Sequence, residues 1–97
     1  MEMEEEARLI ILKELAKEDN KAMSSARMQS FLLTRALIDK PREWVELQYA
    51  FLKDMGAVTV MDLDTVRIAQ LAERGEHHLT GLISIKGVMR ASARPGR

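Results

Sequence analysis

The sequence contains no cysteine and has only one tryptophan, one tyrosine, two phenylalanines and two prolines among its 97 residues. Without cysteine, neither a disulfide nor a thiolate metal site can stabilise the fold, so packed side chains must do so. The scarcity of aromatic residues beside many aliphatic ones favours helices over a β-sandwich. We therefore expect one small, mainly helical domain.

Long apolar runs are also missing. No stretch approaches the roughly 18 apolar residues of a membrane-spanning helix. The acidic start over residues 1–6 lacks the basic region of a secretory signal peptide. Together with the lack of cysteine, which fits a reducing compartment, these features predict a cytoplasmic protein without a membrane segment.

Net charge is absent as well, because 15 basic and 15 acidic residues cancel. A net charge of zero argues against a generally cationic nucleic-acid binder. The charges are nevertheless arranged in blocks along the sequence. Residues 1–20 and 43–64 each have a net charge of −4, whereas residues 21–42 and 65–97 each have a net charge of +4. Such blocks either create a dipolar surface or are simply solvated faces.

Apolar spacing predicts three helices followed by a hairpin. Helical periodicity covers residues 4–17, about 25–37 and 41–55, and Pro41 is favourable in a first helical turn. Beyond Gly56 the period changes to two over 58–61 and 66–69, which predicts a short β-hairpin. The segment Ala72-Glu73-Arg74-Gly75-Glu76-His77-His78-Leu79 then opens a short fourth helix that ends near Gly81, before a basic tail.

Three short sequence motifs resemble motifs of known protein families. Residues 52–58, Leu-Lys-Asp-Met-Gly-Ala-Val, resemble the Leu-x-x-x-Gly-Leu-Val phrase of winged-helix regulators of the MarR and ArsR type. Residues 71–75 are similar to their Leu-Thr-x-x-Gly phrase, with Ala72 in place of Thr. Residues 87–91 resemble the Gly-Val-x-Arg-Pro tail of small winged-helix proteins of Mu-like phages and prophages, with Ala91 in place of Pro.

This resemblance spans roughly residues 7–92 and implies a mainly α fold with a small β-hairpin, a winged helix-turn-helix. It implies a winged domain over residues 1–82, made of three helices, a two-stranded wing and a short C-terminal helix. A basic tail over residues 83–97 follows, and we expect its last part to be mobile. The implied function is non-enzymatic DNA binding or transcription regulation of phage or prophage type.

In a winged helix the third helix enters the major groove, and the resemblance places groove contacts near Arg42, Glu43, Trp44, Glu46 and Leu47. Two of these residues are carboxylates, and Asp62 and Asp64 flank the wing tip. We expect phosphate contacts from basic residues of helices 2 and 3 and of the tail, namely Arg27, Arg35, Lys40, Arg42 and Arg90. The tail either meets helix 2 on the DNA backbone or lies on the acidic N-terminal helix of its own or of another subunit.

A second hypothesis keeps the fold and makes it a protein-interaction module that does not bind DNA. On a helical projection, Val45, Tyr49 and Leu52 form a stripe that faces the core. Beside it lies a second apolar stripe with Trp44, Leu47 and Phe51. This stripe is either buried within the same subunit or forms the interface of a homodimer or of a complex with another phage protein.

Other chemistry has little support in the sequence. His77 and His78 are adjacent, so their side chains diverge by about 100° on a helix and do not bind one metal ion together easily. No partnered nucleophile or phosphate-binding loop is recognisable. We expect no enzyme activity, no metal and no cofactor.

Overall fold

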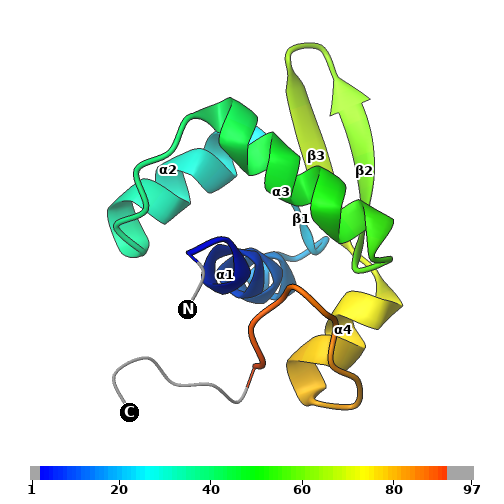
Figure 1. Ribbon diagram of the computed structural model, residues 1–97. Helices are drawn as coiled ribbons and strands as arrows, with labels where there is room; N and C mark the ends of the chain where they lie inside the picture. Colours follow the sequence, from blue (N-terminus) through cyan, green and yellow to red (C-terminus); the bar gives the residue numbers. More distant parts are fainter. Residues whose placement is uncertain (1–2, 92–97) are drawn as a thin grey trace.

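A computed structural model describes residues 3–91 of the chain, with four helices and one sheet (Figure 1). The sheet has three antiparallel strands in the order β1-β3-β2. This arrangement is consistent with the predicted winged-helix layout. In chain order, the elements are α1 (Met3–Lys17), β1 (Ala22–Ser24), α2 (Ser25–Arg35), α3 (Arg42–Asp54), β2 (Val58–Leu63), β3 (Val66–Leu71) and α4 (Glu73–Thr80).

The helices lie where the sequence predicts them. α3 begins after Pro41, which occupies the N-cap position, and α4 ends at Gly81, whose φ of 84° is left-handed. α2 ends at Arg35, earlier than expected, because Leu37 adopts a φ of 57° and the Ile38 N–H donates to the Leu32 carbonyl. None of the helices formed by residues 3–91 has the length and apolarity needed to cross a membrane.

The β-hairpin is confirmed and is longer than the sequence predicts. β2 pairs with β3 from Val58↔Leu71 to Leu63↔Val66. The third strand, β1, was not predicted, because its three residues carry no alternating pattern and follow a polar turn. It pairs with the far edge of β3, with Met23 opposite Ala69, and so joins the hairpin to the chain that enters α2.

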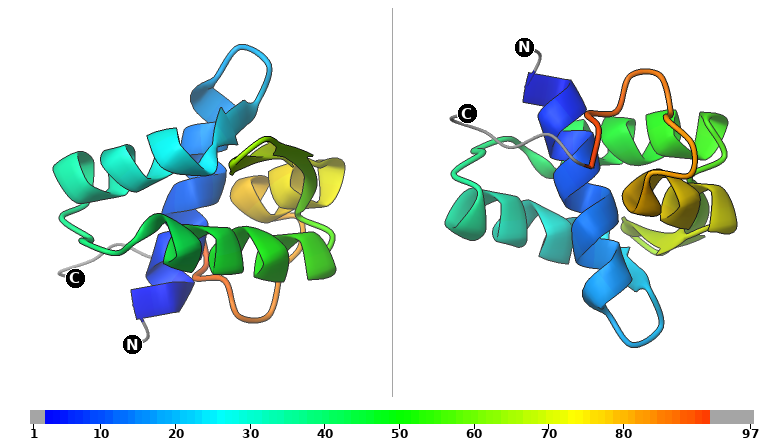
Figure 2. Two further views of the ribbon diagram at one scale, coloured as in Figure 1. Left: turned by 90° about the horizontal axis from the view of Figure 1, so that it is seen from above. Right: turned by 90° about the horizontal axis from the view of Figure 1, so that it is seen from below.

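A single aliphatic core lies between the helices and one face of the sheet. Seen from above, α2 and α3 run side by side and α1 crosses beneath them (Figure 2). The stripe Val45, Tyr49 and Leu52 is buried, as the helical projection predicts. The other fully or almost fully buried apolar residues of the helices include Ala7, Leu9, Ile11, Leu12, Leu15, Met28 and Leu32.

The chain after α4 packs back onto α1. Ile85 and Val88 are buried in the common core, and the Met89 N–H donates to the Glu5 carbonyl at 3.1 Å. Packing therefore extends beyond residue 82, where we expected the domain to give way to the tail. Of the two positions considered for the tail, the described part lies on the N-terminal helix. The predicted mobility of the last residues concerns positions 92–97, which lie outside the described residues.

Candidate nucleic-acid interface

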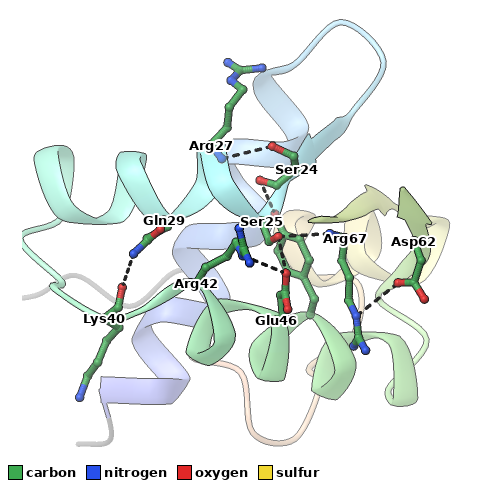
Figure 3. Close-up of polar contacts among 10 residues, drawn as sticks. Ser24, Ser25, Arg27, Gln29, Lys40, Arg42, Glu46, Asp62 and Arg67 are labelled. Carbon is green, nitrogen blue, oxygen red and sulfur yellow. Dashed lines mark hydrogen bonds and ion pairs between the residues drawn. The ribbon is translucent and has the colours of Figure 1, made fainter. Parts of the chain in front are cut away.

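α2, α3 and the β2–β3 hairpin lie together on one side of the molecule, above α1 (Figures 1 and 2). Seen from above, α2 and the hairpin lie on the same side of α3, with α2 beside its N-terminal half and the hairpin beside its C-terminal half (Figure 2). This is the face on which a winged helix would present its third helix. Figure 3 looks onto it and shows Arg42 and Arg67 directed into the space between α2, α3 and the hairpin. Arg27 and Lys40 extend away from that space, from α2 and from the α2–α3 loop.

One buried serine joins the three elements of this face. Ser25 is fully buried, and its hydroxyl donates to Oε2 of Glu46 at 2.7 Å. The hydroxyl oxygen of Ser25 also accepts the Arg67 N–H at 3.2 Å. Ser25 therefore connects the start of α2 to the middle of α3 and to β3, and fixes how the hairpin sits beside α3 (Figure 3).

Three arginines of this face are each held by a carboxylate. Arg42 Nε lies 3.6 Å from Oε2 of Glu46, and Arg67 Nε lies 3.3 Å from Oδ1 of Asp62. The Arg27 guanidinium lies 3.4 Å from Oε1 of Glu18. Partly exposed pairs of this kind contribute only about 0–1 kcal/mol. They are weak enough for a strong external anion to displace.

Two of the predicted cations stand apart from these pairs. Arg35 is exposed at the end of α2. Lys40 is positioned by its backbone, because the amide of Gln29 donates to its carbonyl at 3.1 Å, and its Nζ lies 5.7 Å from the centre of the Trp44 ring. Within residues 3–91, no carboxylate forms an ion pair with either side chain. Their charges are available to solvent.

Arg90 is not brought together with the other four predicted cations. The segment that contains it lies below α1, whereas α2 and α3 lie above α1 (Figures 1 and 2). Arg90 lines a shallow pocket that is otherwise formed by the end of α4 and the loop after it. The predicted set thus separates into a group on the α2–α3 face and one cation on the opposite side.

The outward surface of α3 carries few groups that read bases. Glu43, Leu47 and Asp54 are exposed, with Leu47 66% accessible. Lys53 is also exposed and lines a hollow between α3 and the hairpin, together with Asp54, Asp62 and Arg67. Along α3, the exposed surface therefore presents a leucine and a lysine between two carboxylates.

The three residues predicted as interface anchors differ in their surroundings. Leu47 is exposed, whereas Trp44 and Phe51 are partly buried against the core. The Arg8 guanidinium covers the Phe51 ring at 3.7 Å from its centre. For Phe51, then, the alternative of burial within the same subunit describes what is found. Leu47 is the open member of the set.

Tyr49 of α3 anchors β1 through a buried hydrogen bond. Its buried hydroxyl donates to the Met23 carbonyl at 3.0 Å. Burial, and to a smaller extent the negative charge of Glu46, raise the pKa of the Tyr49 phenol well above its usual range. The hydroxyl therefore stays protonated and remains a hydrogen-bond donor.

Sequence reasoning missed the connecting roles of Ser25 and Glu46 and the position of Arg67. On a helical projection, Glu46 falls outside the stripe that faces the core, and a serine at the start of a helix is ordinarily expected to be its N-cap. That cap is Ser24, whose hydroxyl accepts the Arg27 N–H. A Ser-Ser pair at a helix start shows no pattern that would reveal which serine is buried. The alternation of the hairpin could have placed Arg67 on the face directed toward the helices, because it shares a side of β3 with the buried Ala69 and Leu71.

His78 has a structural role that its sequence did not predict. It is buried, with both ring nitrogens bonded to backbone groups of the chain after α4. His77, by contrast, is partly exposed. Within the described part of the chain, no three His, Cys, Asp or Glu side chains are grouped so as to hold a metal ion.

Comparison of the chain with models of protein families, with curated proteins and with solved structures finds no match. The features that bear on function are therefore the geometry of the α2–α3 face and the resemblance of short motifs in the sequence.

Proposed function

We propose that this chain is a non-enzymatic winged-helix protein that binds double-stranded DNA, in the manner of an accessory regulator of phage or prophage type. The observation that supports this proposal most directly is the placement of Arg27, Arg35, Lys40 and Arg42 on and between two helices beside a projecting hairpin. Phosphate contacts from such cations supply most of the affinity in sequence-independent DNA binding.

The proposed mechanism is neutralisation of the DNA backbone rather than reading of base edges. Arg and Lys side chains at the ends of α2 and α3 would meet phosphates, with α3 at or in the groove. The exposed Glu43 and Asp54 on α3 oppose close approach to phosphates. Binding by this surface is therefore expected to be salt-sensitive and weakly dependent on sequence.

A binding assay on a random duplex over a series of salt concentrations tests this function. We expect the logarithm of the affinity to fall linearly with the logarithm of the salt concentration. The double variant Arg35→Ala/Arg42→Ala should flatten that slope by about one for each phosphate contact that is lost. Lys13→Ala/Lys86→Ala removes the same charge from exposed positions outside α2 and α3 and should leave the slope unchanged. Absence of binding at low salt would remove the proposal.

A protein-interaction module is the second candidate. It is favoured by large apolar side chains that are open on α3 and on the hairpin: Leu47 is 66% exposed, Met61 62% and Leu63 52%. A homodimer or a complex with another phage protein would cover them. Leu47→Asp should then lower the mass measured by sedimentation, whereas Leu82→Asp, at a residue 69% exposed after α4, should not. Equal masses for both variants and the parent protein would exclude a homodimer through Leu47.

A further inference from the structure

We propose that, in the free protein, Glu46 and Asp62 form ion pairs with the two arginines that DNA phosphates would otherwise contact, Arg42 and Arg67. DNA then binds by replacing these two carboxylates of the protein with phosphates. This inference rests on the proposed DNA-binding function and adds Arg67 to the phosphate-binding residues. It also gives the acidic residues of this face a defined effect, which is to lower the affinity.

The Arg42–Glu46 pair has the geometry of an exchangeable contact. Its separation of 3.6 Å is too long for a hydrogen bond, and Arg42 Nε is buried without a hydrogen-bond partner in the described residues. The Glu46 oxygen nearest to it already accepts the Ser25 hydroxyl at 2.7 Å. Arg42 is therefore held by charge alone, while Glu46 is fixed by Ser25.

The Arg67–Asp62 pair is exchangeable for a different reason. Both side chains are open, at 45% and 74% exposure, and they line the hollow between α3 and the hairpin. The backbone of Arg67 is anchored separately, because its N–H donates to Ser25. The guanidinium can consequently change its partner without any movement of the hairpin (Figure 3).

A phosphate is a better partner than either carboxylate in this geometry. Guanidinium groups bind phosphate through two parallel hydrogen bonds, whereas neither pair makes such a double contact here. Each exchange nevertheless gives up an existing ion pair, and this loss weakens DNA binding. Replacing the carboxylate by its amide removes the competitor and keeps the shape of the side chain. In Glu46→Gln, the oxygen of the new amide can still accept the Ser25 hydroxyl.

The test measures affinity for one random duplex at a single low salt concentration, for the parent protein and for Glu46→Gln, Asp62→Asn and Glu73→Gln. Glu73→Gln is the matched control, because it changes the net charge equally on α4 at a side chain 85% exposed. We expect Glu46→Gln and Asp62→Asn each to tighten binding by about three- to fivefold relative to the control, the size of one partly exposed ion pair. The gain from Glu46→Gln should disappear in an Arg42→Ala background.

The outcomes of this test separate the two proposals. If the parent protein binds DNA and the two variants behave like Glu73→Gln, the exchange is overturned and DNA binding stands. The same conclusion follows if the gain from Glu46→Gln persists without Arg42. If neither the parent protein nor any variant binds at low salt, the proposed function fails and the exchange fails with it. Thermal unfolding of each variant verifies that the fold is intact.

Discussion

Nδ1 of His78 accepts the backbone N–H of Ile85 at 3.0 Å. The tautomer of the ring is therefore determined, since Nδ1 must be unprotonated to accept this bond. Nε2 then carries the proton and donates to the Met89 carbonyl at 2.8 Å. One imidazole thus fixes two turns of the chain after α4, and it places Ile85 and Val88 in the core.

We expect His78→Ala to lower the free energy of unfolding by about 2–4 kcal/mol, because two backbone groups lose their partner and a cavity remains. Urea denaturation measures this value. His77→Ala, at the partly exposed neighbour, should change it by less than about 0.5 kcal/mol. Similar losses at both positions would contradict the fastening role of His78.

Gly87 should not tolerate a side chain. Its φ is +88°, and a Cβ there would lie 2.4 Å from Cζ of Phe51, whose ring also packs against the Arg8 guanidinium. We expect Gly87→Ala to cost about 2–4 kcal/mol, from backbone strain together with overpacking. Gly81→Ala is the matched control, because its φ is +84° with no atom within 4 Å of the added carbon. That variant should lose only about 1 kcal/mol, so equal melting temperatures for the two variants would refute the steric contact.

Tyr49→Phe should reduce stability by about 1–2 kcal/mol at neutral pH, because the buried Met23 carbonyl loses its donor. The raised pKa of Tyr49 also predicts a dependence on alkaline pH. The unfolded chain ionises its tyrosine near pH 10, while the folded protein keeps the phenol neutral, so the folded state loses stability as the pH rises above about 10. In Tyr49→Phe the loss of stability between pH 9 and 11 should be smaller. An identical loss in both proteins would show that other groups cause it.

Leu37 sits in a conformation that suits glycine. Its φ is +57°, and its side chain is 85% exposed. Leu37→Gly removes this strain and should raise the free energy of unfolding by about 0.5–1 kcal/mol. Leu33→Gly, at an exposed leucine inside α2, should lower it by about 1 kcal/mol. A loss of stability in Leu37→Gly would mean that the leucine makes a contact that offsets its strain.

Helices and hairpin were predictable because their signals are local. The apolar stripe of α3 and the stops at Gly56 and Gly81 each depend on residues within a few positions of one another. β1 was missed because its pairing partner, β3, lies more than 40 residues later in the sequence. A strand of three residues has no periodicity of its own, and only the tertiary contact makes it a strand.

The candidate site was predictable in its cations and only partly in their partners. Arg27 and Arg42 could be selected by residue type and position. The Arg27–Glu18 pair depends on how α2 packs beside the end of α1. Arg42 and Glu46, by contrast, lie four residues apart on α3, a spacing that the sequence alone shows. The burial of the polar residues Ser25 and His78 was also missed. Residues of their type are often exposed, and only the tertiary packing shows that these two are not.

The backbone N–H of Met89 donates to the Glu5 carbonyl over an N···O distance of 3.1 Å. This hydrogen bond places the first and last described segments of the chain next to each other. The place where these two segments meet lies on the opposite side of α1 from the α2–α3 face. A short linker that joins residue 91 to residue 3, with new ends opened at the exposed Asp64-Thr65 tip, should give a circular permutant of residues 3–91 with the same core. In such a permutant the two strands of the hairpin would belong to opposite ends of the polypeptide, which offers a direct way to delete either strand alone.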